Sequence, residues 1–262
     1  MKMLKFIIVL PLLFAPCVFA TNLNETNASK ASQSEIEYQN SDIFKKAQTA
    51  YNEGRYSEAS LLYKKLLSHG VKNVEVEYNL ANAYFKNTQL PEAVWHYRKA
   101  WYAKPRDPDI RANMHFAINA AGAIEPAMGL TEKLFSALSQ NEWITGAIGA
   151  YFLLMLLLTL GVLIRPSRRS LFRLSLLPLA FIFLCAGGWH HWQQLIDLPE
   201  WVVVKTEATA LYGPIKESKA HYKIPLAALV RQRSAETKGW VEIEYDGKKG
   251  WINKKYIHRV SP

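Results

Sequence analysis

Two long apolar runs without a charged residue constrain this chain more than any other feature. They cover Ile144–Ile164 and Leu174–Ile196, 21 and 23 residues, and each is long enough to cross a hydrocarbon core of about 30 Å as a helix. The bridge between them, residues 165–173, contains four arginines, and short arginine-rich loops stay in the cytoplasm. We therefore expect a membrane hairpin, with transmembrane helices over 143–164 and 174–196 and both flanking regions exported. The arginines that determine this topology are Arg165, Arg168, Arg169 and Arg173.

The N-terminus agrees with export. Lys2 and Lys5 precede an apolar stretch that ends at Phe19, and Ala20 is the small residue before Thr21. This layout predicts a secretory signal peptide over residues 1–20. An uncleaved anchor is the alternative, although its apolar core is short for a membrane span. Residues 21–39 are polar and lack a period, so we expect a flexible leader.

Charge and cysteine content exclude several function classes. The formal net charge is +10, but residues 21–142 contain as many acidic as basic side chains. The excess lies in the signal, the arginine bridge and residues 197–262. No soluble segment has a concentrated basic stripe, so nucleic acid is not expected as a partner. Cys17 leaves with the signal and Cys185 lies in the second apolar run, so no disulfide can form within the mature chain.

Residues 40–119 repeat at a period of 34 residues. Ala59 and Tyr63 recur as Ala93 and Tyr97, and Pro105 closes the second copy. This period, with small residues where helices cross and aromatic residues one turn later, resembles the tetratricopeptide repeat. The resemblance implies helical hairpins over 40–73 and 74–107 and a capping half-repeat over 108–119.

The same resemblance implies a groove that receives a peptide of another protein. We expect Asn82 to hydrogen-bond an extended backbone there, whereas Tyr78 replaces the lysine of the carboxylate-binding relatives. Packing between neighbouring helices is the alternative role for the aromatic residues. The groove positions are Phe44, Gln48, Tyr51, Glu75, Tyr78, Asn82, Phe85, Lys86 and Phe116.

Residues 120–142 form a linker to the membrane. Within it, Leu134 and Leu138 share one helical face, so a short helix lies on the bilayer surface or docks on the repeats as a cap. Trp189, Trp192 and Trp201 are expected in the outer aromatic belt of the membrane.

Short β runs follow from residue 201. They cover 201–205, 208–212, 226–233, 240–245, 248–252 and 256–260. Asp246-Gly247 predicts a type I′ hairpin turn, which pairs Glu244 with Lys249 and Glu242 with Trp251. The Gly239-Trp240 and Gly250-Trp251 elements resemble the bacterial SH3 domain over residues 201–262. We therefore expect a small all-β barrel.

The aromatic residues of this barrel form its candidate ligand surface. The register places Trp240 and Trp251 on the outward face, where paired aromatic rings bind cell-wall peptide, glycan or protein. One bulge would reverse the register and bury Trp251, and we favour burial of Trp251 with exposure of Trp240 and Tyr212. The surface residues are Tyr212, Trp240, Trp251 and Tyr256.

No catalytic constellation is present, so we expect neither an enzyme nor a cofactor or metal site. Cys185 lies at membrane depth and the seven histidines are scattered, which leaves no nucleophile and base pair. The order of signal, repeats, hairpin and barrel resembles the E member of the Bat aerotolerance proteins of Gram-negative bacteria. That resemblance implies a multi-pass inner-membrane protein with periplasmic domains and partners such as von Willebrand A-type membrane proteins. The expected function is an envelope scaffold; a peptidoglycan-binding sensor or tether is the alternative.

Overall fold

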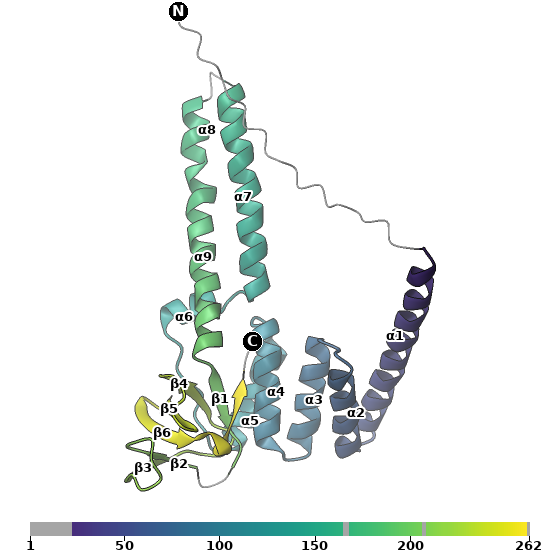
Figure 1. Ribbon diagram of the computed structural model, residues 1–262, viewed down its shortest axis with the longest axis vertical. Coiled ribbons are helices and arrows are strands. Elements are labelled where there is room, and N and C mark those ends of the chain that lie inside the picture. The colour runs from purple at the N-terminus through teal and green to yellow at the C-terminus, as the bar shows by residue number, and fades with distance from the viewer. Residues whose placement is uncertain (1–22, 165–167, 206–207, 261–262) are drawn as a thin grey trace, which may run out of the picture. The chain divides into compact units, whose positions relative to one another are not determined.

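The computed structural model describes residues 23–164, 168–205 and 208–260 (Figure 1). The proposed signal peptide and Arg165 lie outside these residues, as does the side chain of Arg168. The chain divides into two compact units, residues 1–41 and 42–262.

Helix α1 (Leu23–Asn52) replaces the expected flexible leader. The prediction for residues 23–39 was wrong because a segment without an apolar period can still be helical. This stretch contains no glycine or proline and includes three glutamates, two alanines and two glutamines, which favour helix. In the second unit, Ile43, Ala47 and Ala50 of α1 are buried.

Four further helices pack consecutively after α1. They are α2 (Tyr56–Ser68), α3 (Val74–Lys86), α4 (Leu90–Ala103) and α5 (Pro108–Ala120). The side chains of Asn73 and Asp107 cap the N-termini of α3 and α5 by accepting backbone N–H bonds, as short polar residues do at this position. Ala81 and Ala93 are fully buried. We call residues 42–120 the helical array.

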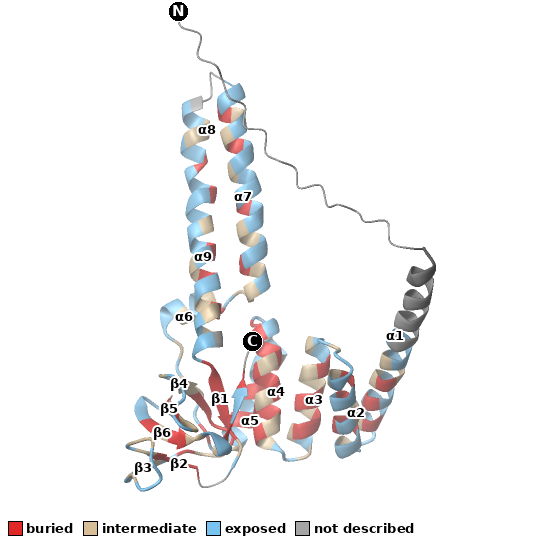
Figure 2. Cartoon of the chain, in the orientation of Figure 1, coloured by how far each residue is buried: buried red, intermediate tan, exposed pale blue. Residues whose placement is uncertain are grey.

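Helices α7 (Gln140–Leu163) and α9 (Leu176–Asp197) pack side by side along their lengths (Figure 1). Both are long and apolar enough to cross a membrane, and Figure 2 shows that most of their surface is exposed. Ser139 and Glu142 form a reciprocal capping box at the start of α7. Part of the expected arginine bridge is helical: it belongs to the short helix α8 (Arg168–Leu174), which precedes α9. The side chains of Arg169 and Arg173 are exposed.

Two glycines of α9 let bulky aromatic side chains approach its backbone. A Cβ atom on Gly188 would lie 2.3 Å from the ring of Trp143, and one on Gly187 would lie 3.1 Å from the ring of Phe135. Phe135 ends the short helix α6 (Leu130–Phe135). The absence of side chains at this glycine pair therefore allows α6 and the start of α7 to pack closely against α9.

The C-terminal residues 200–260 form one seven-stranded antiparallel sheet, which we call the sheet domain. Its strands are β1 (Glu200–Val203), β2 (Thr209–Leu211), β3 (Ala220–Lys223), β4 (Leu229–Gln232), β5 (Trp240–Tyr245), β6 (Lys248–Asn253) and β7 (Ile257–Val260), in the order β3-β2-β6-β5-β4-β1-β7. The sequence prediction missed β3, whose residues Ala220, His221 and Lys223 are exposed and so lack an apolar alternation. A short 3-10 turn, η2 (Lys254–Tyr256), precedes β7.

The central hairpin has the register predicted from its turn. Glu244 pairs with Lys249 and Glu242 with Trp251, without a bulge between β5 and β6. Asp246 and Gly247 both have positive φ, as a type I′ turn requires. The inner residues Val241, Ile243 and Ile252 are fully buried.

Candidate functional site

A groove in the helical array contains most of the predicted peptide-binding residues. The groove has a volume of about 590 Å³. We call it the array groove, and its lining residues are Tyr51, Tyr78, Asn82, Phe85, Lys86, Tyr97, Asn113, Phe116 and Ala120. Phe44, Gln48 and Glu75 are not among them; Phe44 packs against Tyr63, and Gln48 and Glu75 are exposed.

Hydrogen bonds within the array groove fix the orientation of the Asn82 amide. Tyr97 Oη donates to Asn82 Oδ1 at 2.6 Å, and Asn113 Nδ2 donates to the same oxygen at 3.1 Å. Asn113 Nδ2 also donates to Tyr78 Oη at 2.7 Å. The Asn82 side chain also hydrogen-bonds to the phenol of Tyr78. The amide is therefore held in one orientation within the array groove, where it can meet the backbone of a bound peptide.

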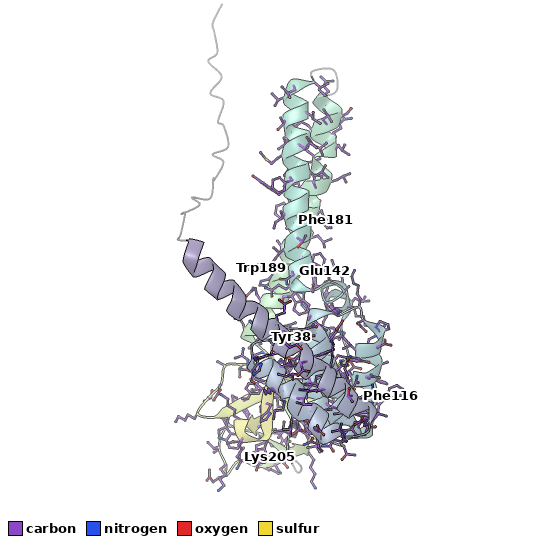
Figure 3. The ribbon with its side chains drawn as sticks, turned by 90° about the vertical axis from the view of Figure 1, so that its right-hand side faces the viewer. Tyr38, Phe116, Glu142, Phe181, Trp189 and Lys205 are labelled. Carbon is purple, nitrogen blue, oxygen red and sulfur yellow. The ribbon has the colours of Figure 1, made fainter. Side chains whose placement is uncertain are left out.

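The array groove is aromatic and contains one lysine. Burial raises the pKa of both Tyr51 and Tyr78, so these phenols are neutral and act as hydrogen-bonding groups. Phe116 is 63% exposed, and Figure 3 shows it on the side of the array away from the sheet domain. Such a surface suits an extended peptide with apolar side chains, because aromatic rings supply contact area and the few polar groups fix register.

The predicted ligand residues of the sheet domain do not form one pocket with the array groove. Tyr212 is exposed and stacks on His221, with ring centroids 4.1 Å apart. Trp240 and Trp251 lie on the outer face of the hairpin and are half-buried. Trp251 was expected to be buried and Trp240 exposed, but the register has no bulge and both rings are partly buried on the same face. Tyr256 is also half-buried, beside the ammonium group of Lys255.

A buried ion pair joins the helical array to the sheet domain. Arg98 of α4 donates from Nε and Nη2 to Glu200 of β1 at 2.5 Å and 2.8 Å, and Tyr102 Oη donates to Glu200 at 2.9 Å. The side chains of Arg98 and Glu200 are only 3% and 1% exposed. The guanidinium group also lies 4.0 Å from the ring centroid of Trp101. This is a bidentate, fully desolvated pair of the kind that depends on both partners.

The interaction between Arg98 and Glu200 stabilises the ionised form of both side chains. Burial favours neutral Glu200, but the attraction and hydrogen bonds of Arg98 outweigh burial and hold the pKa of Glu200 below its ordinary value. Burial likewise opposes the charge on Arg98, yet Glu200 raises the pKa of Arg98 above its ordinary value. The pair is therefore ionised at neutral pH.

Other contacts extend this interface on both sides. Arg231 of β4 lies 3.7 Å from Glu200 and 2.6 Å from Glu132 of α6. Trp95 Nε1 donates to the carbonyl oxygen of Arg259 at 2.7 Å. Glu132, Arg231, Glu200 and Arg98 thus form a chain of alternating charges, which we call the ion chain. It connects α6, the sheet domain and the array.

Two tryptophans expected at the membrane surface are instead buried in this region. Trp192 of α9 is fully buried, donates from Nε1 to the carbonyl of Leu138 at 3.0 Å and contacts the ring of Tyr102. Trp201 is part of β1 and donates from Nε1 to Gln232 at 2.9 Å. The prediction failed for both because a contact with α4 or β4 outweighs membrane affinity. Trp189 is 47% exposed.

A second, partly buried charge cluster lies within the helical array. His96 Nδ1 and Lys99 Nζ each lie 2.6 Å from a carboxylate oxygen of Glu77. Burial lowers the pKa of His96, although Glu77 acts in the opposite direction. For Glu77, the hydrogen bonds and charges of His96 and Lys99 outweigh burial and lower its pKa. The cluster therefore ties α3 to α4 through neutral His96 and two charged groups.

No sequence motif indicated these interface residues. In the structure, helix α4 has buried residues on nearly every face, including His96, Arg98, Trp101 and Tyr102, whereas a helix with one covered side has a narrower apolar stripe. A helix buried all round needs a further partner, and that partner is β1 and β7. A pocket of about 480 Å³ lies beside this contact, with Trp95, Trp201 and Arg259 in its lining.

Comparison with known proteins covers only the sheet domain. The chain matches no curated protein and no solved structure. Residues 204–258 match the family model described as the bacterial SH3 domain.

Proposed function

We propose that this protein is a non-catalytic scaffold anchored in the bacterial inner membrane. Its helical array, a set of tetratricopeptide repeats, binds an extended segment of a partner protein, and its SH3-like sheet domain holds a second ligand. The observation that carries the proposal is the array groove, in which Asn82 is oriented by Tyr97 and Asn113. The Bat resemblance supports von Willebrand A-type membrane proteins as partners in an aerotolerance complex.

Site-specific photo-crosslinking tests the array groove. A benzophenone side chain at Phe116 lies in the groove, whereas one at Leu61 of α2 lies outside it and is similarly exposed, at 66% against 63%. We expect adducts with an envelope protein from position 116 alone. Asn82→Ala removes the proposed hydrogen bond to the bound backbone, which is worth about 0.5–1.5 kcal/mol, and should reduce those adducts. Identical adducts from both positions, unchanged by Asn82→Ala, would refute use of the groove.

The proposed topology has both soluble regions in the periplasm. Single cysteines at Lys86, Lys249 and Ser170 report it, since all three side chains are exposed and none is a topology-determining arginine. In intact spheroplasts an impermeant maleimide should label positions 86 and 249, whereas position 170 should react only after lysis. Labelling of position 170 in sealed cells would contradict the proposed orientation.

A cell-wall sensor or tether is the second candidate, and the match of residues 204–258 to the bacterial SH3 domain favours it. Purified sacculi distinguish it from the scaffold. If the tether is correct, the full-length protein sediments with sacculi and Tyr212→Ala weakens sedimentation, while Asn82→Ala does not. If the protein does not sediment with sacculi and its crosslinking depends on Asn82, the scaffold is the only one of the two candidate functions that is supported.

A further inference from the structure

Helix α6 is fixed to the ends of both long apolar helices. Its Phe135 ring packs edge-on against Trp143 of α7, with centroids 6.0 Å apart, and approaches the backbone of Gly187 in α9. Trp143 Nε1 donates to the carbonyl oxygen of Phe135 at 2.9 Å. These contacts place α6 at a defined level along the α7–α9 pair.

That level is the outer end of the apolar surface. Charged and strongly polar residues stop at Glu142 in α7, and in α9 they resume at His190. Figure 3 shows Glu142 and Trp189 at the same end of the two helices, with Phe181 further along α9. Phe135 touches Trp143 and Gly187, so α6 lies where hydrocarbon gives way to lipid headgroups.

At this level α6 presents an apolar face to the outside. Leu130 is 87% exposed and Leu134 is 53% exposed, and residues four apart share one face of a helix. The opposite side is occupied, because Glu132 pairs with Arg231 of the sheet domain at 2.6 Å. Helix α6 contacts α9, so this exposed leucine face lies beside the outer end of the apolar helix pair.

We propose that α6 is an interfacial anchor whose Leu130 and Leu134 insert into the outer leaflet of the lipid bilayer. The occupant is lipid because the leucine face lies beside a surface that lipid already covers, at the boundary where short amphipathic helices bind. Lys133 is exposed beside them and reaches the headgroup phosphates. This inference rests on the membrane hairpin of the proposed function.

The anchor gives the ion chain a role. Glu132 of the anchored helix pairs with Arg231, Arg231 lies beside Glu200, and Glu200 pairs with Arg98 of the array. Seating α6 in the bilayer therefore fixes the orientation of the sheet domain and the helical array relative to the membrane. The anchor thus determines the distance from the membrane surface at which the array groove binds a partner.

Nitroxide accessibility in proteoliposomes tests the anchor with the full-length chain. Cys17 and Cys185 are replaced by alanine, and a single spin label is placed at Leu134, Leu61 or Leu156, three exposed leucines of α6, α2 and α7. Oxygen concentrates in bilayers and a nickel chelate is excluded from them. We expect a high ratio of oxygen to nickel collision rates at Leu156, a smaller but clear rise at Leu134, and a low ratio at Leu61.

Each other outcome overturns either the anchor or the membrane hairpin. A ratio at Leu134 equal to that at Leu61, with Leu156 in lipid, refutes the anchor and leaves the hairpin intact. A label at Leu134 shielded from both reagents means that protein covers α6, which also refutes the lipid contact. A low ratio at Leu156 refutes the membrane hairpin itself.

Discussion

The carboxylate of Glu200 receives both donors of the Arg98 fork, although the two residues are 102 positions apart in the chain. One belongs to helix α4 and the other to the first strand of the sheet domain. Neither side chain is accessible to water. The helical array and the sheet domain are therefore one cooperative structure, so a fragment that lacks either would expose half of a desolvated ion pair.

Loss of one partner should be far more damaging than loss of both. Glu200→Gln leaves Arg98 charged and buried, which costs about 3–5 kcal/mol, whereas a hydrophobic pair of similar volume is often neutral. We expect a large fall in the unfolding midpoint in detergent for Glu200→Gln, and substantial recovery in the double variant Arg98→Met/Glu200→Leu. The matched control is Glu236→Gln, because the Lys254–Glu236 pair is exposed and such pairs contribute less than about 1 kcal/mol. Equal effects of the two glutamine variants would contradict this view.

Mild acid should destabilise the array through His96. Its pKa is lowered by burial, so the unfolded chain binds a proton first as pH falls. The stabilisation is complete above the ordinary histidine pKa of about 6.5 and is lost as pH falls from there toward the folded-state pKa. His96→Gln keeps an amide donor for Glu77 but cannot titrate. Between pH 7.5 and 5.5, the unfolding midpoint should fall less in His96→Gln than in the wild type; parallel curves would exclude His96 as the cause.

A methyl group on Gly188 should disturb the junction of α6, α7 and α9. The added Cβ would lie 2.3 Å from the buried Trp143 ring, and overpacking of this kind costs about 1–3 kcal/mol. Gly149→Ala is the matched control, since nothing lies within 4 Å of its Cβ position and alanine favours helix by up to about 1 kcal/mol. Detergent unfolding should show Gly188→Ala less stable than the wild type and Gly149→Ala at least as stable. The reverse order would refute the close packing.

Tyr97→Phe should impair partner capture without removing any residue that faces a bound peptide carbonyl. The phenol oxygen orients Asn82 at 2.6 Å, and without it the Asn82 amide can rotate away from the groove. Crosslinking from position 116 should therefore weaken in Tyr97→Phe, but less than in Asn82→Ala. Full crosslinking in Tyr97→Phe alongside loss in Asn82→Ala would show that the amide is oriented without Tyr97.

Local patterns predicted the features that depend on neighbouring residues. Asp246-Gly247 determines its own turn, and the turn then determines the register of Glu244 and Lys249. Six of the predicted groove residues line the array groove, because residues 34 positions apart, such as Tyr51 and Phe85, lie on the same side of the helical array.

Contacts between residues far apart in the sequence could not be predicted from such local patterns. Neither Arg98 nor Glu200 belongs to a motif, and their pairing depends on how the sheet domain docks on α4. Trp192 was misassigned for the same reason, because a tryptophan near an apolar run fits a membrane belt until Leu138 and Tyr102 are known to surround it. Helix α1 was missed for a different reason, since residues 23–39 are helical but have no apolar period that would indicate a helix.

The junction between α9 and β1 consists of Leu198 and Pro199 alone. Proline restricts both its own backbone and that of the preceding residue, so the junction has almost no slack. Mechanical load on the sheet domain, for instance from a ligand held elsewhere in the envelope, would therefore pass directly to α9 and displace α8, which precedes it.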